Sequence, residues 1–316
     1  MRAVVLEDFG RWHVRDVPEP DPPEPPEVLI RVRASSLNPS DWKLGDGAFR
    51  HFYDYRFPLR LGRDYLGTVE ASGSDVSRFA VGDTVFGHPP VAYLGLRGTF
   101  AEWIVLPEAS CMAAKPAELS DLAAAILPLA VLTAVDCVDF VAPEPGDRVL
   151  VVGSTGGVGV AAIQLLVARG AEVVATGLPD EEAFLTGLGV AATIDFRRGT
   201  AAGVAARYPD GVDHLVDLAG SDDEFRAIVQ LVREGGRIAT TLSRGEGDLV
   251  PPGVAGRNAF TPHDPVLLEE VGRLAAAGNL TMPIANTCSL DELPDALHSL
   301  RDQPVRGKVA VQIGAV

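Results

Sequence analysis

Hydrophobic residues follow two different patterns along the chain. Up to about residue 115 they occur in short runs that alternate with polar positions and are closely punctuated by Gly and Pro. These runs are RAVVLE, EVLIRVRA, LGTVEASG, DTVFG and TFAEWIVLP. Short strands with frequent turns are typical of an antiparallel, partly closed β-barrel. The Pro- and Glu-rich stretch PEPDPPEPPE lies between two of the strands, so we expect a stiff surface loop there.

From about residue 120 onward, helical patterns alternate with continuous apolar runs. SDLAAAILPLAVLTAVDCV has Ser120 at an N-cap position and is expected to be helical, with an interruption or kink at Pro128. The apolar runs that follow are DRVLVVG, EVVATG, ATIDF, HLVDLAG and GRIATTL. Buried strands alternating with helices predict an α/β domain with a doubly wound parallel sheet. The final run GKVAVQIGAV is strand-like and is compatible with a return to the first domain.

The segment RVLVVGSTGGVG combines a strand, a glycine-rich turn and the start of a helix. Such a turn lets the backbone approach a pyrophosphate, and the helix N-terminus offers free N–H groups to the phosphates. The spacing G-x-x-G-x-x-G has one residue more than the common G-x-G-x-x-G. We therefore expect a nicotinamide cofactor here, the alternative being a glycine-rich packing turn. The residues are Gly153, Ser154, Thr155, Gly156, Gly157 and Val158.

The choice between NADPH and NADH depends on the end of the second strand of this domain. Thr176 and Gly177 stand where an NAD site prefers an acidic residue for the ribose 2′-OH. Their neutrality favours NADPH, although NADH stays possible because PDEE follows at once. Arg197 and Arg198 are the nearest candidates for contact with a 2′-phosphate; the alternative is that they are solvated loop charges.

Composition limits the classes of function. A length of 316 residues favours about two domains, and a formal charge of −16 argues against nucleic acid and anionic membrane surfaces as partners. The three cysteines are far apart, which excludes a disulfide framework and suits a reducing compartment. Charges interrupt the apolar N-terminus and no apolar run reaches ~18 residues, so we expect a cytoplasmic protein without signal peptide or membrane insertion.

Several segments, in this order, resemble the medium-chain dehydrogenase/reductase superfamily, specifically its zinc-free quinone oxidoreductase (zeta-crystallin-like) branch. They are NPSDW, FPLRLGRDYLGTV, VGDTVFG, GTFAEWIVLP, LPLAVLTA, VVGSTGGVG and GKVAVQIG. The resemblance implies a GroES-like partly closed β-barrel domain (1–117 and 283–316) and a Rossmann doubly wound parallel-sheet domain (118–282). It also implies a cofactor in the cleft between the domains and a homodimer.

The resemblance also implies where a catalytic zinc would lie in related enzymes. Asn38 occupies the position of a zinc-binding Cys, and Gly62-Arg63-Asp64 that of a Gly-His-Glu motif. No cysteine lies between Val81 and Ser110, where relatives carry a structural-zinc lobe. Zinc needs deprotonated S, N or O ligands, and Arg63 is a fixed cation. We therefore expect no zinc.

Without a Lewis acid, alcohol oxidation is disfavoured, and hydride addition to a quinone or α,β-unsaturated carbonyl (enone) is the feasible chemistry. Asn38 is a candidate hydrogen-bond donor to the acceptor, and Tyr53 or Tyr55 a candidate donor of a hydrogen bond or proton. Each has a structural alternative: Asn38 caps the strand end, Asp41 N-caps a short helix, and Arg63 with Asp64 forms a local ion pair or braces the barrel.

The resemblance implies further cofactor contacts: Thr133 at the nicotinamide ribose, Thr241, Leu242 and Ser243 at the pyrophosphate or nicotinamide, Phe260 near the nicotinamide, and Lys308. Two departures weaken the prediction of NADPH, because Glu181 and Phe196 stand where NADPH-binding relatives often have Lys and Tyr.

The six histidines show no HxxxH or HxH spacing and are expected to be chance surface or loop residues, with His51 kept as a candidate because it shares a loop with the two tyrosines.

The prediction is an NADPH-dependent, zinc-independent oxidoreductase acting on a small-molecule quinone or enone. Two alternatives stay open. One is a tailoring enoyl or ketone reductase with a bulky natural-product substrate, and the other is an NADPH-binding or sensing protein without useful turnover.

Overall fold

A computed structural model describes residues 1–51, 53–303 and 305–314. The chain forms two units. Unit 1 contains Met1–Leu129 and the segment that begins at His263, and unit 2 contains Ala130–Pro262.

The unit boundaries lie at 129/130 and 262/263, whereas the domains implied by the resemblance meet at 117/118 and 282/283. Helices α2 (Asp121–Ala125) and α8 (Pro265–Ala276) account for the difference. Helix α2 packs on strands of unit 1, and α8 packs on the unit 1 strand β8 (Cys111–Ala114). A Cβ added at Gly272 of α8 would lie 3.0 Å from Phe86 Cζ, so this helix approaches the barrel closely. Both helices fall within the range 118–282 that was expected for the Rossmann domain.

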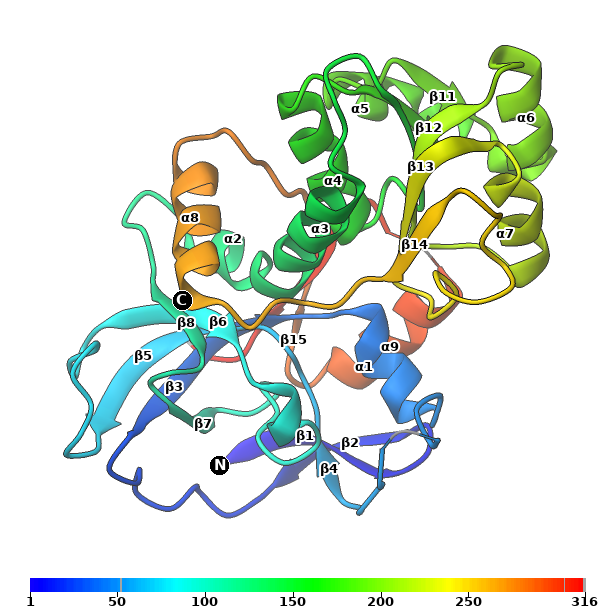
Figure 1. Ribbon diagram of the computed structural model, residues 1–316. Helices are drawn as coiled ribbons and strands as arrows, with labels where there is room; N and C mark the ends of the chain where they lie inside the picture. Colours follow the sequence, from blue (N-terminus) through cyan, green and yellow to red (C-terminus); the bar gives the residue numbers. More distant parts are fainter. Residues whose placement is uncertain (52, 304, 315–316) are drawn as a thin grey trace. The chain divides into compact units, whose positions relative to one another are not determined.

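Unit 1 is built on two sheets (Figure 1). A three-stranded sheet has the order β2-β1-β4; a seven-stranded sheet has the order β15-β16-β3-β5-β6-β8, with β7 also paired to β3. All these pairings are antiparallel except that of β15 with β16. The other strands of the unit are β1 (Arg2–Asp8), β2 (Arg11–Asp16), β3 (Glu27–Ser36), β4 (Leu59–Arg60), β5 (Tyr65–Ser72), β6 (Thr84–His88), β7 (Trp103–Pro107), β15 (Ile284–Ser289) and β16 (Lys308–Gln312).

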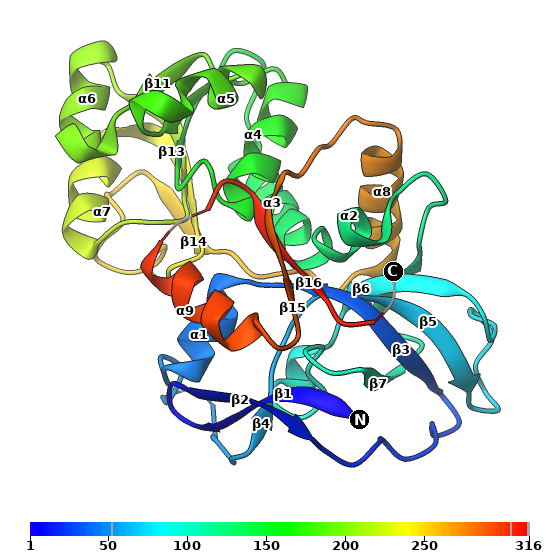
Figure 2. The same ribbon diagram turned by 180° about the vertical axis from the view of Figure 1, so that it is seen from behind.

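Alternation in strand β3 decides which side chains enter the core of unit 1. Val28, Ile30 and Val32 are buried in one hydrophobic cluster, while Arg31 between them is exposed. The C-terminal strand β16 lies beside β3 and pairs with it antiparallel (Figure 2). The predicted return of the C-terminal strand to the first domain is thus confirmed for its described part, Lys308–Gln312. Helices α1 (Pro39–Gly45) and α9 (Leu293–Asp302) also contact each other in this unit.

Unit 2 contains a six-stranded sheet with the order β11-β10-β9-β12-β13-β14, in which all neighbours are parallel. Figures 1 and 2 show α3 and α4 along one face of this sheet and α6 and α7 along the other. The predicted doubly wound sheet is confirmed. The elements are β9 (Arg148–Val152), β10 (Glu172–Thr176), β11 (Ala192–Ile194), β12 (Val212–Asp217), β13 (Val232–Thr240), β14 (Ala255–Asn258), α3 (Pro128–Val141), α4 (Gly157–Ala168), α5 (Glu182–Gly187), α6 (Thr200–Arg207) and α7 (Asp222–Val229).

The helical stretch that follows Ser120 is interrupted where the sequence predicted. Ser120 Oγ accepts the Ala123 N–H at 3.2 Å and caps α2. Helix α2 ends at Ala125, and α3 begins at Pro128. Proline is tolerated at the first position of a helix because the N–H it lacks would have no intrahelical partner there.

None of the helices in the described part of the chain combines the length and apolarity that crossing a membrane requires.

Candidate functional site

In unit 2, polar groups gather at the carboxyl edge of the parallel sheet, where ligands of open α/β sheets bind. Strand β9 ends in the glycine turn, and Gly153 has φ +83°, a left-handed conformation that favours glycine. Ser154 Oγ donates to the Val151 carbonyl at 2.7 Å, and Thr176 Oγ1 accepts the Gly153 N–H at 3.1 Å. Both hydroxyls therefore brace the turn rather than point away from it.

Two glycines in this turn have different surroundings. A Cβ at Gly159 would clash with the Gly153 carbonyl oxygen and lie 2.8 Å from Ser154 Cα, so the close contact of α4 with the turn requires glycine. A Cβ at Gly156 would meet only the Gly153 oxygen, at 3.8 Å. Gly156 is the N-cap of α4, and its open side presents bare backbone at a helix N-terminus. Thr155, Gly157 and Val158 are half-buried in the same turn.

The ends of β10 and β11 lie side by side. Gly177, after β10, donates its N–H to the Ile194 carbonyl at 3.0 Å. Arg197 and Arg198 follow β11 in the short 3₁₀ helix Phe196–Arg198, and both are exposed. Arg198 pairs with Asp195 at 3.4 Å. Glu181 lies close to Gly177, because its carboxylate accepts the N–H of the next residue, Leu178, at 2.8 Å. Two arginines after β11 and Glu181 after β10 thus follow the ends of two neighbouring strands.

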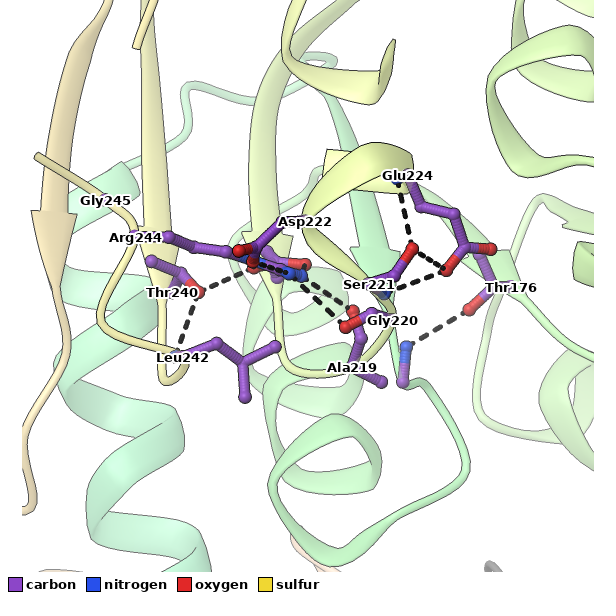
Figure 3. Close-up of polar contacts among 12 residues, drawn as sticks. Thr176, Ala219, Gly220, Ser221, Asp222, Glu224, Thr240, Leu242, Arg244 and Gly245 are labelled. Atoms are coloured by element: carbon purple, nitrogen blue, oxygen red, sulfur yellow. Dashed lines mark hydrogen bonds and ion pairs between the residues drawn. The ribbon is translucent and has the colours of Figure 1, made fainter. Parts of the chain in front are cut away.

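A buried ion pair, which the sequence reasoning missed, organises the next part of this edge (Figure 3). Arg244 donates to both carboxylate oxygens of Asp217, each at 2.9 Å, and Thr240 Oγ1 donates to the same carboxylate at 2.6 Å. Arg244 also donates to the Ala219 carbonyl at 3.0 Å and pairs with Asp222 at 3.2 Å. The two loops that follow β12 and β13 are therefore fixed to each other.

This ion pair positions the predicted contacts Thr241, Leu242 and Ser243. The Thr241 N–H donates to the Asp217 carbonyl at 3.1 Å, and the Leu242 N–H to Thr240 Oγ1 at 3.1 Å. Ser243 has φ +56°, an uncommon conformation for a residue other than glycine. Such conformations persist only where the surrounding structure holds them.

The other two cofactor candidates of unit 2 lie near the beginning and end of its chain segment. Thr133 Oγ1 is 2.7 Å from Thr261 Oγ1. Phe260 is 75% exposed, and its N–H donates to Asp136 at 3.1 Å. The aromatic ring is thus available to a ligand.

Unit 1 contains a second polar cluster, which is fully buried and centred on Asp64. The Asp64 carboxylate accepts from Ser36 Oγ at 2.6 Å, Asn38 Nδ2 at 2.8 Å and the Leu129 N–H at 2.7 Å. Lys308 Nζ lies 3.5 Å from it and donates to the Asn38 amide oxygen and, at 2.8 Å, to the Leu37 carbonyl. Both ends of the Asn38 side chain and the Lys308 ammonium are therefore engaged inside unit 1, and their contacts with acceptor or cofactor stay predictions.

Asn38, not Asp41, is the N-cap of α1. The alternative that Asp41 N-caps the helix is thus wrong: Asp41 is its third residue and accepts the Asn38 N–H at 2.8 Å. Burial raises the pKa of Asp41 from 3.8 to about 7, against the opposing effect of the Asn38 N–H and nearby Arg63 and Lys308.

Replacing Asp41 by Asn should flatten the pH dependence of stability. Because the folded pKa lies above the unfolded value, the folded chain holds the extra proton, so wild-type stability falls as pH rises from 3.8 to about 7. The variant lacks this loss, so its free energy of unfolding relative to that of the wild type should increase over that pH range. Urea unfolding at pH 5 and pH 8 measures the difference, and parallel pH profiles would contradict the assignment.

Arg63 has no hydrogen bond or ion pair within the described residues, and its Nε is buried without a partner. Of the two structural alternatives for Arg63, the local ion pair with Asp64 is therefore not formed. Burial lowers the pKa of Arg63, while Asp41 and Asp64 oppose that shift. Together with Asn38, whose amide oxygen accepts from Lys308, this cation does not supply the ligand set of a tetrahedral zinc.

The two candidate tyrosines donate to backbone carbonyls. Tyr53 Oη donates to Leu94 at 2.6 Å, and Tyr55 Oη to Leu44 at 2.8 Å. Their rings pack with Phe9 and Phe57 in an aromatic cluster. His51 is exposed in the same loop. Since both hydroxyl protons are engaged, we assign neither tyrosine as the proton donor.

Comparisons with known proteins agree with this architecture. Residues 24–116 match the family model "Alcohol dehydrogenase GroES-like domain", and residues 188–311 match "Zinc-binding dehydrogenase". The chain is 31% identical to the 2-methylene-furan-3-one reductase of Solanum lycopersicum, over 98% of this chain and 79% of that protein.

Two solved structures have nearly the same fold as the whole chain. The quinone oxidoreductase of Coxiella burnetii is 28% identical, with a TM-score of 0.90 over 99% of each chain. A structure described as an NAD-dependent alcohol dehydrogenase is 31% identical, with a TM-score of 0.88 over 99% of this chain and 100% of the other. From its two units, its matched family models and these relatives, the chain belongs to the medium-chain dehydrogenase/reductase superfamily of oxidoreductases.

Proposed function

We propose that the protein is an NADPH-dependent oxidoreductase that reduces a quinone or an α,β-unsaturated carbonyl compound. The observation that carries this proposal is the glycine turn at the carboxyl edge of the parallel sheet, in a chain whose relatives are named quinone oxidoreductase and 2-methylene-furan-3-one reductase. The second name itself describes a conjugated carbonyl acceptor.

The residues of unit 2 fit a nicotinamide dinucleotide. The bare backbone at Gly156 and the start of α4 suit the pyrophosphate. The loop Thr241–Ser243, fixed by Asp217 and Arg244, and the exposed ring of Phe260 are the proposed contacts further along the cofactor. When bound, the reduced nicotinamide supplies a hydride.

Reduction of the acceptor adds one hydride and one proton. In a conjugated carbonyl the hydride goes to the β-carbon, negative charge develops on the carbonyl oxygen, and the α-carbon then takes a proton from solvent. Arg63 is the cation we assign to stabilise that oxygen, because it has no anionic partner within hydrogen-bond distance among the described residues. A fixed positive charge would do here what a metal does in zinc enzymes.

The proposal is tested by following NADPH absorbance with a panel of small quinones, cyclic enones and saturated ketones. Turnover is expected with the first two and not with saturated ketones, which lack the conjugated electrophilic carbon. Activity only with bulky thioester or polycyclic enones would favour the tailoring-reductase alternative. Tight NADPH binding with no turnover across the panel would favour the sensing protein.

We expect Arg197 and Arg198 to set the preference for NADPH. Replacing both by Ala should raise KM for NADPH about 10- to 100-fold, the equivalent of losing charge-assisted hydrogen bonds to a phosphate, and leave KM for NADH nearly unchanged. Arg207→Ala is the matched control, since this exposed arginine is the last residue of α6, which leads to the amino end of β12 and thus away from the carboxyl edge of the sheet. Equal losses with NADPH and NADH would contradict the assignment.

A further inference from the structure

A cluster of potential metal ligands lies in unit 1, outside the residues assigned above. His88, Cys111 and His263 each offer one ligand atom, and these three atoms lie within 4.8 Å of one another. The residues are far apart in the chain, and this is the one such cluster found among the described residues.

The fold explains why these side chains meet. His88 ends β6 and Cys111 begins β8, and the two are direct partners in the antiparallel register, so their side chains share one face of the sheet. His263 lies two residues before α8, which packs on β8. The rings of His88 and His263 meet edge to face, with centroids 5.3 Å apart.

Hydrogen bonds already orient two of these groups. His88 Nδ1 lies 3.2 Å from the Pro89 carbonyl oxygen, within hydrogen-bond distance. Metal-binding histidines usually have such an outer hydrogen bond. His263 Nε2 accepts the Cys111 N–H at 3.1 Å, so its lone pair points toward Cys111.

We propose that His88, Cys111 and His263 bind one Zn²⁺ ion, with the fourth position open to water or another small ligand. Zinc is bound by Cys sulfur at about 2.3 Å and His nitrogen at about 2.0–2.1 Å, which places ligand atoms roughly 3.3–3.6 Å apart in a tetrahedron. Because the three atoms lie within 4.8 Å of one another, binding requires them to approach one another by at most roughly 1.5 Å. Since His263 is exposed while the other two residues are buried, the ion enters from the His263 side.

Binding involves two local exchanges. The Cys111 thiol, which lies 3.5 Å from the Asp264 carbonyl, loses its proton to solvent and becomes a thiolate. The His263 lone pair leaves the Cys111 N–H for the metal. Arg63, which acts electrostatically on His263, opposes the dication, and the new thiolate charge offsets that repulsion.

The bound ion would tie the loop before α8 to the ends of β6 and β8. This role differs from the catalytic zinc of related enzymes, whose ligand positions the resemblance assigns to Asn38 and Gly62-Arg63-Asp64. Because the ion binds the folded chain, it should also raise the thermal midpoint of unfolding.

The test uses the full-length protein after treatment with a chelator. Titration with Zn²⁺ should show one site per chain, and Co²⁺ should give a thiolate-to-cobalt charge-transfer band. Cys111→Ser should abolish the band, whereas Cys137→Ser and Cys288→Ser, which alter the other two buried cysteines, should keep it.

His263→Gln serves as a second variant, because an exposed side chain is replaced and the fold should be kept. It should weaken Zn²⁺ binding at least about tenfold. Removing a residue that only hydrogen-bonds to a metal ligand already lowers metal affinity about 10- to 100-fold, and loss of a ligand itself should cost no less. Absence of stoichiometric binding in the wild type, a band that survives Cys111→Ser, or unchanged affinity in His263→Gln would overturn the proposal. These readouts do not depend on enzymatic activity.

Discussion

Gly159→Ala is expected to destabilise the protein and abolish NADPH binding. The added methyl group would clash with the Gly153 carbonyl oxygen and lie 2.8 Å from Ser154 Cα, and both are backbone atoms that cannot rotate away. The turn and α4 would have to separate, at a cost of about 1–3 kcal/mol in unfolding free energy. Urea unfolding and fluorescence titration with NADPH measure the two effects.

Gly156→Ala separates cofactor binding from folding. Its methyl group would meet only an oxygen at 3.8 Å, so unfolding free energy should change by less than about 0.5 kcal/mol. The same methyl group would stand where we place the pyrophosphate, and the Kd for NADPH should rise about tenfold or more. If both variants bound NADPH like the wild type, the turn would be a packing feature only.

Asp64→Ala should have the largest effect on the stability of unit 1. It removes the acceptor shared by Ser36, Asn38 and the Leu129 N–H, and it leaves the Lys308 ammonium buried without its carboxylate. Removing one partner of a buried ion pair costs about 3–5 kcal/mol. Urea unfolding should show this loss.

An exposed ion pair provides the control. Asp54→Ala breaks the contact of Asp54 with Arg56 at 2.8 Å, where both side chains are more than 70% exposed, and should change stability by less than about 1 kcal/mol. The double variant Asp64→Leu/Lys308→Met should be more stable than the sum of the single losses predicts. Additive losses would show that Asp64 and Lys308 act independently.

Features determined by neighbouring residues were predictable from the sequence. The end of β9 just before Gly153, the helix that starts at Gly157 and the break at Pro128 each follow from a few adjacent residues. The alternation in β3 likewise predicted its buried face. Periodicity and turn chemistry act over short distances, which is why these elements could be read directly.

Contacts between distant segments were not predictable in the same way. Asn38 and Lys308 were both candidates, yet their hydrogen bond spans 270 positions and depends on the pairing of β16 with β3. Asp217 ends β12 and Arg244 lies in the loop after β13, and no local pattern links them. One signal could have pointed to that pair. Asp217 is a polar residue at the end of the apolar run in HLVDLAG, where the carboxyl end of a buried strand was expected.

The same limit explains the histidines. His88 and His263 were interpreted as chance residues because neither has a partner at metal-binding spacing. Their meeting with Cys111 depends on strand register and on α8 belonging to unit 1. Sequence spacing detects only ligand sets carried by one loop or helix.

The central claim is direct hydride transfer to a conjugated acceptor without a metal. It is tested most directly with chelator-treated protein, a cyclic enone and NADPH deuterated at the transferred position of C4, by analysing the product with mass spectrometry and NMR. We predict one deuterium on the carbon β to the carbonyl, at a rate unchanged by chelation. A product without deuterium at that carbon, or a reaction that chelation stops and Zn²⁺ restores, would contradict the claim.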